Sequence, residues 1–195
     1  VHLGFWGKDA VWNHAKITDA SLAKELLRRK AEAKSGTSQI VGTSETSVNN
    51  YLKAVSGIEM SAKDYRNFHA TRIAQDAAVE MGNAPTVTES AFKKAFVEAF
   101  KPFAGEKIST ERKEEVARAV MLTLQEQRLI DTVGEIVAPQ LGHKPTESIK
   151  TYVDPVVWED VGWKKQFAKE TERWVAKART YSRQTLFPTK KKKKS

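Results

Sequence analysis

Residues 141–155 read LGHKPTESIKTYVDP and place His143 nine residues before Tyr152. A tyrosine phenol has a pKa of about 10, so it attacks near neutral pH only where neighbouring groups stabilise the phenolate or take its proton. Tyr152 would therefore need cationic side chains around it to act as a nucleophile. The alternative interpretation is a half-buried packing tyrosine beside an ordinary turn histidine, and this stretch alone leaves both open.

Helix-boundary signals in the same stretch predict where the two side chains lie. Gly142 is typical of the C-cap of a preceding helix, whose apolar side chains are Val133, Ile136 and Val137. Pro145 near the start and the Asp154-Pro155 pair after the end predict a short helix over 146–153. Tyr152 would lie near the end of this helix and His143 in the turn before it, so both can face one pocket.

Composition narrows the class of partner. The 195 residues include 33 Lys plus Arg against 24 Asp plus Glu, a formal charge of +9, which favours nucleic acid first and an acidic membrane surface second. The absence of cysteine excludes disulfides, thiolate metal sites and cysteine nucleophiles. No apolar run approaches the roughly 20 residues of a membrane span, and no signal-peptide pattern opens the chain. We therefore expect a soluble intracellular protein, with the choice between cytoplasm, nucleoid and nucleus left open.

The first residues predict a β-hairpin. Residues 1–6 and 11–15 flank Gly7-Lys8-Asp9-Ala10, which puts Lys8 at an exposed tip, where a solvated turn lysine is the ordinary alternative. The opening VHLGFW resembles the interior of a sheet, and a strand needs a partner, so we expect that residues belonging upstream are absent from this chain.

The remainder predicts a mainly helical fold. Helices are expected from Asp19 to about 34 and over about 47–55, 61–81 and 88–100, with a loop over 35–45. A further helix is expected to begin near 109, another to end at 141, and one long helix to follow Pro155. The expected apolar stripes are Leu22, Leu26 and Leu27, then Val48, Tyr51, Leu52 and Val55, then Ala70, Ile73, Ala74, Ala77, Ala78 and Met81, then Phe92, Phe96 and Phe100, and then Val116, Val120 and Leu124. We expect a catalytic domain over 1–188 and a disordered lysine-rich tail over 189–195 that is solvated, helps hold DNA or acts as a targeting signal.

The helix that begins near residue 61 carries a candidate phosphate-binding turn. Ser61 and Asp64 form a variant of the capping box, and Lys63 and Arg66 lie three positions apart on one face. Helix N-termini attract phosphate, although a solvated cationic face is the alternative. His2, His14 and His69 have no partner at metal-ligand spacing, and no nucleotide-binding or zinc motif is present, which disfavours a metal enzyme.

Three segments together resemble the catalytic domain of type IB DNA topoisomerases, and are closest to the small bacterial and poxvirus-type enzymes. They are FWGKDA, TSVNNYLKAVSGIEMSAKDYRNFHAT and LGHKPTESIKTYVDP, and the resemblance runs over about residues 1–157. It implies the mainly helical catalytic core of the DNA breaking-rejoining enzymes, which tyrosine recombinases share. It also implies double-stranded DNA as the partner and no membrane.

The resemblance assigns roles by position. Lys8 matches a general acid toward the 5′ oxygen, Arg66 matches an arginine on the non-bridging phosphate oxygens, His143 supports the same phosphate, and Tyr152 becomes joined to the 3′ phosphate. The nearby lysines expected to bind DNA are Lys63, Lys144 and Lys150. Preorganised cations and one acid suit phosphoryl transfer, and the phosphotyrosine bond conserves the energy of the broken diester, so no metal, ATP or other cofactor is expected.

The sequence departs from the family's pattern in one respect, and two other interpretations of its function remain open. The family has a first catalytic arginine ahead of the hairpin and an N-terminal clamp, which these residues lack, so we expect a missing N-terminal segment or a second chain to complete the site. The chain alone should bind DNA but cleave it poorly. A tyrosine recombinase shares the fold but usually carries histidine where Lys63 stands here, and a non-catalytic DNA-binding derivative is the second rival.

Overall fold

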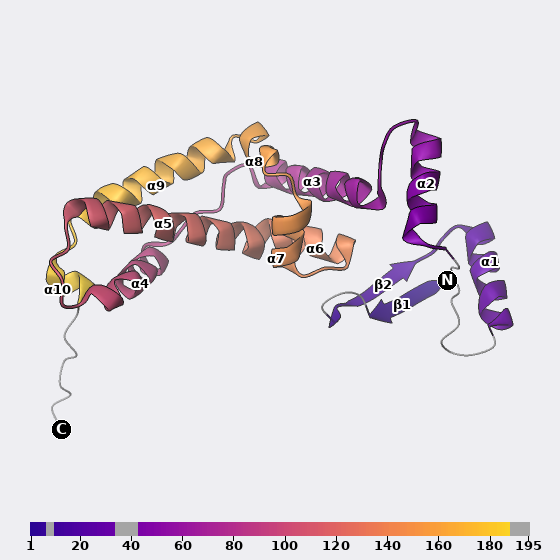
Figure 1. The fold of residues 1–195 in the computed structure, drawn as a ribbon, viewed down its shortest axis with the longest axis horizontal. Helices are drawn as coiled ribbons and strands as arrows, with labels where there is room; N and C mark the ends of the chain where they lie inside the picture. Colours follow the sequence, from indigo (N-terminus) through magenta and orange to yellow (C-terminus); the bar gives the residue numbers. More distant parts are fainter. Residues whose placement is uncertain (7–9, 34–42, 188–195) are drawn as a thin grey trace, which may run out of the picture. The chain divides into compact units, whose positions relative to one another are not determined.

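The structure is a computed structural model that describes residues 1–6, 10–33 and 43–187. It is mostly helical with one small antiparallel sheet near the N-terminus, which confirms the predicted fold class (Figure 1). The chain forms two compact units: unit 1 comprises residues 1–74 and 135–154, and unit 2 comprises 75–134 and 155–195. Within the described ranges, no helix is both long enough and apolar enough to span a bilayer.

The predicted hairpin opens unit 1. Strand β1 (His2–Trp6) pairs antiparallel with β2 (Trp12–Lys16), so Trp6 stands opposite Trp12 (Figure 1). In the described residues this sheet has two strands, and the two tryptophans are 69% and 55% exposed. The connecting residue Lys8 lies outside the described residues.

Helix α1 (Ala20–Glu32) begins where the sequence predicts. The carboxylate of Asp19 accepts the backbone N–H of Leu22 at 2.7 Å and caps the first turn. Only Leu26 of the predicted apolar stripe is buried, whereas Leu22 and Leu27 are exposed. The stripe is therefore wrong in two of its three positions, because α1 has too few neighbours to cover it.

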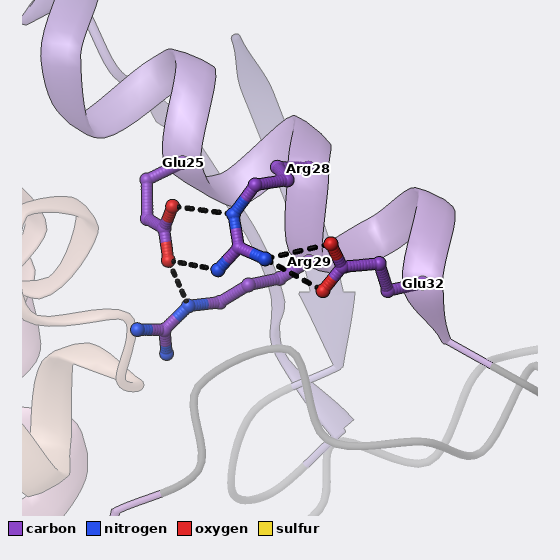
Figure 2. A network of polar contacts seen from close by, with 4 residues as sticks. All are labelled: Glu25, Arg28, Arg29 and Glu32. Atoms are coloured by element: carbon purple, nitrogen blue, oxygen red, sulfur yellow. Dashed lines mark hydrogen bonds and ion pairs between the residues drawn. The ribbon is translucent and has the colours of Figure 1, made fainter.

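A network of charged side chains runs along the exposed surface of α1 (Figure 2). The guanidinium of Arg28 bonds both Glu25 and Glu32 at 2.7 Å, and Arg29 adds a further 2.7 Å bond to Glu25. The neighbouring Arg28 and Arg29 lower the pKa of Glu25 to about 2. Such exposed pairs stabilise a helix only modestly, so the network supports α1 locally.

Helices α2 (Glu45–Ser56) and α3 (Ala62–Met81) are linked by a hydrogen bond at the start of α3. Asn49 of α2 accepts the backbone N–H of Ala62 at 2.9 Å. Ser61 and Asp64 exchange the two bonds of a capping box, of 3.2 Å and 2.9 Å, which confirms that prediction. The Ser61 hydroxyl, which donates to the Asp64 carboxylate at 2.7 Å, and the Ser61 backbone N–H lower the pKa of Asp64.

The predicted buried faces of these two helices are only partly correct. In α2, Tyr51 and Val55 are exposed, and Val48 and Leu52 are half-buried. In α3 the small residues of the predicted stripe are buried, and they are Ala70, Ala74, Ala77 and Ala78.

The rest of unit 1 consists of short segments: α6 (Glu135–Leu141), α7 (Pro145–Glu147) and η4 (Ser148–Tyr152). Gly142 has a φ of 67°, the left-handed conformation expected of a helix C-cap. Of the three apolar residues predicted before it, Val133 and Val137 are buried and Ile136 is exposed.

Unit 2 is a helical assembly around an aromatic cluster. Its segments are α4 (Glu89–Phe100), η2 (Lys101–Phe103), α5 (Thr110–Leu129), η3 (Ile130–Gly134), α8 (Val156–Asp160), α9 (Trp163–Arg179) and α10 (Arg183–Leu186). Helices α5 and α9 lie side by side (Figure 1). The predicted stripe of Phe92, Phe96 and Phe100 is fully buried and packs against Trp174 and Tyr181, so it is confirmed as core.

One prediction in unit 2 is correct in part and one is wrong. The predicted Val116, Val120 and Leu124 of α5 are half-buried and pack against the aromatic core, whereas the fully buried positions are Ala117, Met121 and Gln125, one residue further along. The single long helix expected beyond Pro155 is two helices, because Gly162 adopts a φ of 76° between α8 and α9. The predicted tail over 189–195 and residues 35–42 of the predicted loop lie outside the described residues.

Candidate active site

Tyr152 is the last residue of a π-helical turn in unit 1. The turn η4 follows α7 directly, and the backbone N–H of Val153 donates to the carbonyl of Ser148 at 3.2 Å. Val153 then adopts an extended conformation and is buried, while Tyr152 itself is half-buried. The predicted helix is thus present, but its second half is wound as a π-helix, a form often found at functional sites.

His143 lies against the ring of Tyr152. The two rings stack with centroids 4.9 Å apart and an interplanar angle of 19°. His143 is only 7% exposed, and its backbone N–H donates to Ala138 at 3.2 Å, which anchors the turn after α6. The sequence predicts that both side chains can face one pocket, and the structure places their rings in direct contact.

Arg66 approaches the same tyrosine from α3. Its guanidinium carbon lies 5.8 Å from the centroid of the Tyr152 ring, within the range of a cation–π contact. The Arg66 residue is exposed, and a guanidinium presents several N–H donors in a geometry that matches phosphate oxygens. An imidazole and a guanidinium therefore both lie next to one phenol, all within unit 1.

Strand β2 of the hairpin also reaches this part of unit 1. A Cβ atom on Gly142 would overlap the side-chain amide of Asn13, so strand β2 lies directly against the turn that carries His143. Asn13 is held there by a 3.0 Å bond from its amide nitrogen to Val11. Gly142 is thus favoured by its positive φ, and a side chain there would also displace the Asn13 amide.

The lysines predicted to bind DNA are all exposed. Lys63 lies in the first turn of α3, three residues before Arg66. Lys144 precedes α7 and Lys150 lies within η4, so both are close in sequence to the two aromatic residues of the site.

Sequence reasoning missed two residues that hold the site together. Thr71 of α3 accepts the backbone N–H of Asp154 at 2.9 Å, and Asn13 packs on Gly142. Neither contact has a signal in the sequence, because each joins segments far apart along the chain.

His2 and His14, which show no metal-ligand spacing in the sequence, lie close together in the structure. They are neighbours across the hairpin, with stacked rings 5.0 Å apart and ring nitrogens separated by 3.1 Å. Among the residues that the structure describes, no three His, Asp or Glu side chains gather to form a metal site.

The arrangement suits chemistry on a phosphodiester. Cationic donors beside a phenol can hold the two non-bridging oxygens of a phosphate while the phenol oxygen faces phosphorus. A family model described as eukaryotic DNA topoisomerase I, catalytic core, matches residues 1–153, a range that contains Arg66, His143 and Tyr152.

The chain belongs to this DNA topoisomerase I catalytic-core family. Membership implies topoisomerase function, which is an isomerase activity, and DNA as the substrate. No curated protein and no solved structure matches the chain.

Proposed function

We propose that the chain is the catalytic part of a type IB DNA topoisomerase that relaxes supercoils through a 3′-phosphotyrosine intermediate. The observation that carries the proposal is the placement of Tyr152 beside both the His143 ring and the Arg66 guanidinium. The phenol of Tyr152 loses its proton to solvent, and its oxygen forms a bond to phosphorus as the bond from phosphorus to the 5′ oxygen breaks. The free strand then rotates, and attack by the 5′ hydroxyl reverses the step.

Each predicted residue has a part in this scheme. Arg66 and His143 bind the non-bridging oxygens, where negative charge is concentrated as the phosphoryl group transfers. Lys8 donates a proton to the departing 5′ oxygen. Lys63, Lys144 and Lys150 neutralise neighbouring DNA phosphates, a contribution that falls as salt concentration rises.

The proposed reaction needs no cofactor. The phosphate is a diester both before attack and in the intermediate, so resealing requires no ATP. Side-chain cations supply the charge that a metal ion would otherwise supply.

Residues outside this chain are proposed to complete the site. No arginine precedes Lys8 in these residues, so the family's first arginine would come from a further segment or a second chain. Residues 1–188 would then be the catalytic domain, placed C-terminal to the clamp as in the bacterial and poxvirus-type enzymes, and acting on intracellular DNA. We expect weak plasmid relaxation by these 195 residues alone, and robust relaxation by them alone would contradict this part of the proposal.

The experiment that tests the proposal is covalent trapping on DNA. A duplex whose 5′ fragment dissociates after cleavage prevents religation, so the attacking residue stays attached to the DNA. We expect an adduct that is lost in Tyr152→Phe and retained in Tyr51→Phe, a control that removes an exposed tyrosine hydroxyl on α2. The assay includes the completing segment where the chain alone gives no product.

The remaining outcomes separate the rivals. DNA binding without any adduct, in the presence of the completing segment, would favour a non-catalytic derivative. Cleavage confined to pairs of specific sites in a tetramer would favour a recombinase, although lysine rather than histidine three positions before Arg66 supports the topoisomerase.

A further inference from the structure

The hydrogen bond between Thr71 and Asp154 links the segment after the proposed nucleophile to the helix that carries Arg66. The Thr71 hydroxyl oxygen lies 2.9 Å from the backbone nitrogen of Asp154, and the two residues are 83 positions apart. Thr71 is half-buried on α3, five residues after Arg66. Both groups therefore project from one continuous helix.

The backbone of Asp154 needs such an acceptor. Residue 154 precedes Pro155, and a residue before proline is disfavoured in the helical conformation. The last turn closes one residue earlier, at the bond from Val153 to Ser148, and Val153 is extended. The Asp154 N–H thus falls outside the helical hydrogen-bond ladder, and Thr71 accepts it.

Helix α3 consequently fixes two positions: that of the Thr71 hydroxyl relative to Arg66 and, through the bond to Asp154, that of the chain after Tyr152. Five residues of α-helix rise by about 7.5 Å, so the position of the Thr71 hydroxyl relative to Arg66 is fixed by helix geometry. The bond to Asp154 holds the chain two residues beyond Tyr152. Displacement of this chain would change both the contact of Tyr152 with Arg66 and its stacking on His143.

We propose that Thr71 is a positioning residue, which holds Tyr152 at its attacking distance from a phosphate bound by Arg66. This inference deepens the proposed function and rests on it. A solely structural role would instead alter stability without a selective effect on the cleavage step. The two roles predict different kinetics.

The test compares Thr71→Val, which keeps the shape but removes the acceptor, with Thr71→Ser, which keeps the hydroxyl. Single-turnover cleavage is measured at saturating DNA, in the preparation in which the unsubstituted protein forms its adduct. We expect Thr71→Val to cleave about tenfold more slowly, because losing a hydrogen bond at a positioned nucleophile costs orientation. Thr71→Ser should stay within about twofold of the original rate, and the Kd for DNA should be unchanged in both.

Two further measurements keep the result decisive. Thr123→Val makes the same change at an exposed position of α5, so it reports the cost of valine in a helix and should leave cleavage unaltered. Hydrogen exchange at the Asp154 amide should accelerate in Thr71→Val alone. Equal cleavage rates for Thr71→Val and the unsubstituted protein, or a serine variant as slow as the valine variant, would overturn the inference.

Failure of the proposed function has a different signature. If the unsubstituted protein forms no adduct at residue 152, the proposed chemistry is wrong whatever Thr71 does. If the adduct forms at Tyr152 and the Thr71 variants cleave alike, the chemistry stands and only the positioning role is lost.

Discussion

Unit 2 buries a cluster of large aromatic side chains, whereas the described part of unit 1, which holds Arg66, His143 and Tyr152, leaves several of its own aromatic side chains exposed. The phenylalanines of α4 and Trp174 are at most 2% exposed. In unit 1 the buried apolar residues among those described are Leu26, Ala70, Ala74, Val137, Ala138, Ile149 and Val153, none of them aromatic. The exposed ones include both hairpin tryptophans, Tyr51 and Phe68.

The difference indicates that the two units are stabilised in different ways. Aromatic packing removes a large apolar area from water in unit 2. Unit 1 depends on capping boxes, side-chain bonds to backbone and charged pairs such as those of Figure 2.

The largest expected effect is a substitution in unit 1 that removes DNA cleavage and leaves the stability of the protein unchanged. Tyr152→Phe should abolish adduct formation, because no other group occupies the phenol oxygen's position beside His143 and Arg66. Its unfolding transition should match that of the unsubstituted protein, measured by thermal denaturation. A large loss of stability would mean that the tyrosine is a packing residue after all.

The next effect tests the core of unit 2. Phe96→Ala should destabilise unit 2 by about 3–5 kcal/mol, since it leaves a cavity in a fully buried aromatic cluster. Segment-resolved hydrogen exchange should show the loss in α4, α5 and α9. Equal loss across α1 and α2 would break the comparison, because the two units would then unfold as one.

Arg66→Ala should slow DNA cleavage by about 100-fold to 1,000-fold, the cost typical of removing one preorganised donor from a transition state. Arg66→Lys should restore only part of the rate, because an ammonium cannot make the bidentate contact. Single-turnover cleavage with the DNA Kd measured in parallel checks this. A change in Kd alone would assign Arg66 to DNA binding only.

Many local features of the fold could be predicted from the sequence. Asp19, the Ser61 and Asp64 pair, Gly142 and the phenylalanine stripe of α4 all act through neighbouring residues, so their signals are complete within one segment.

Burial could be predicted less well, because periodicity shows that a face is apolar and not which neighbour covers it. Tyr51 and Val55 of α2 remain exposed for this reason. The buried face of α5 is displaced by one residue, since Met121 and Val120 lie on adjoining faces and only the packing of α9 selects between them.

The prediction that Arg66 joins His143 and Tyr152 in one site came from the family resemblance and not from sequence spacing. Local pattern alone placed His143 near Tyr152. Thr71 and Asn13 were not predicted, because their contacts exist only after distant segments meet.

A smaller effect compares matched helix caps in the two units. Ser61→Ala should cost about 1 kcal/mol by removing the cap of α3, and Ser109→Ala should cost a similar amount at α5. Hydrogen exchange should report the first loss at the start of α3 and the second at the start of α5. An undetectable effect of Ser61→Ala would show that the Asn49 bond alone holds that helix end.

The smallest effect is a pH dependence of α1. The pKa of Glu25 is lowered from 4.5 to about 2 by Arg28 and Arg29, so its stabilising contribution is complete above about pH 4.5 and is lost as pH falls through about 2. Exchange of the α1 amides, corrected for intrinsic pH dependence, should accelerate over that interval. Glu25→Gln should remove the dependence, and an unchanged profile in that variant would assign it to another group.

Mass spectrometry of the trapped protein–DNA adduct tests the central claim most directly. The account predicts a single modified peptide in which the oxygen of Tyr152 is joined to a 3′ phosphate of the cleaved strand. A nucleotide attached to another residue, or attached through a 5′ phosphate, would contradict it.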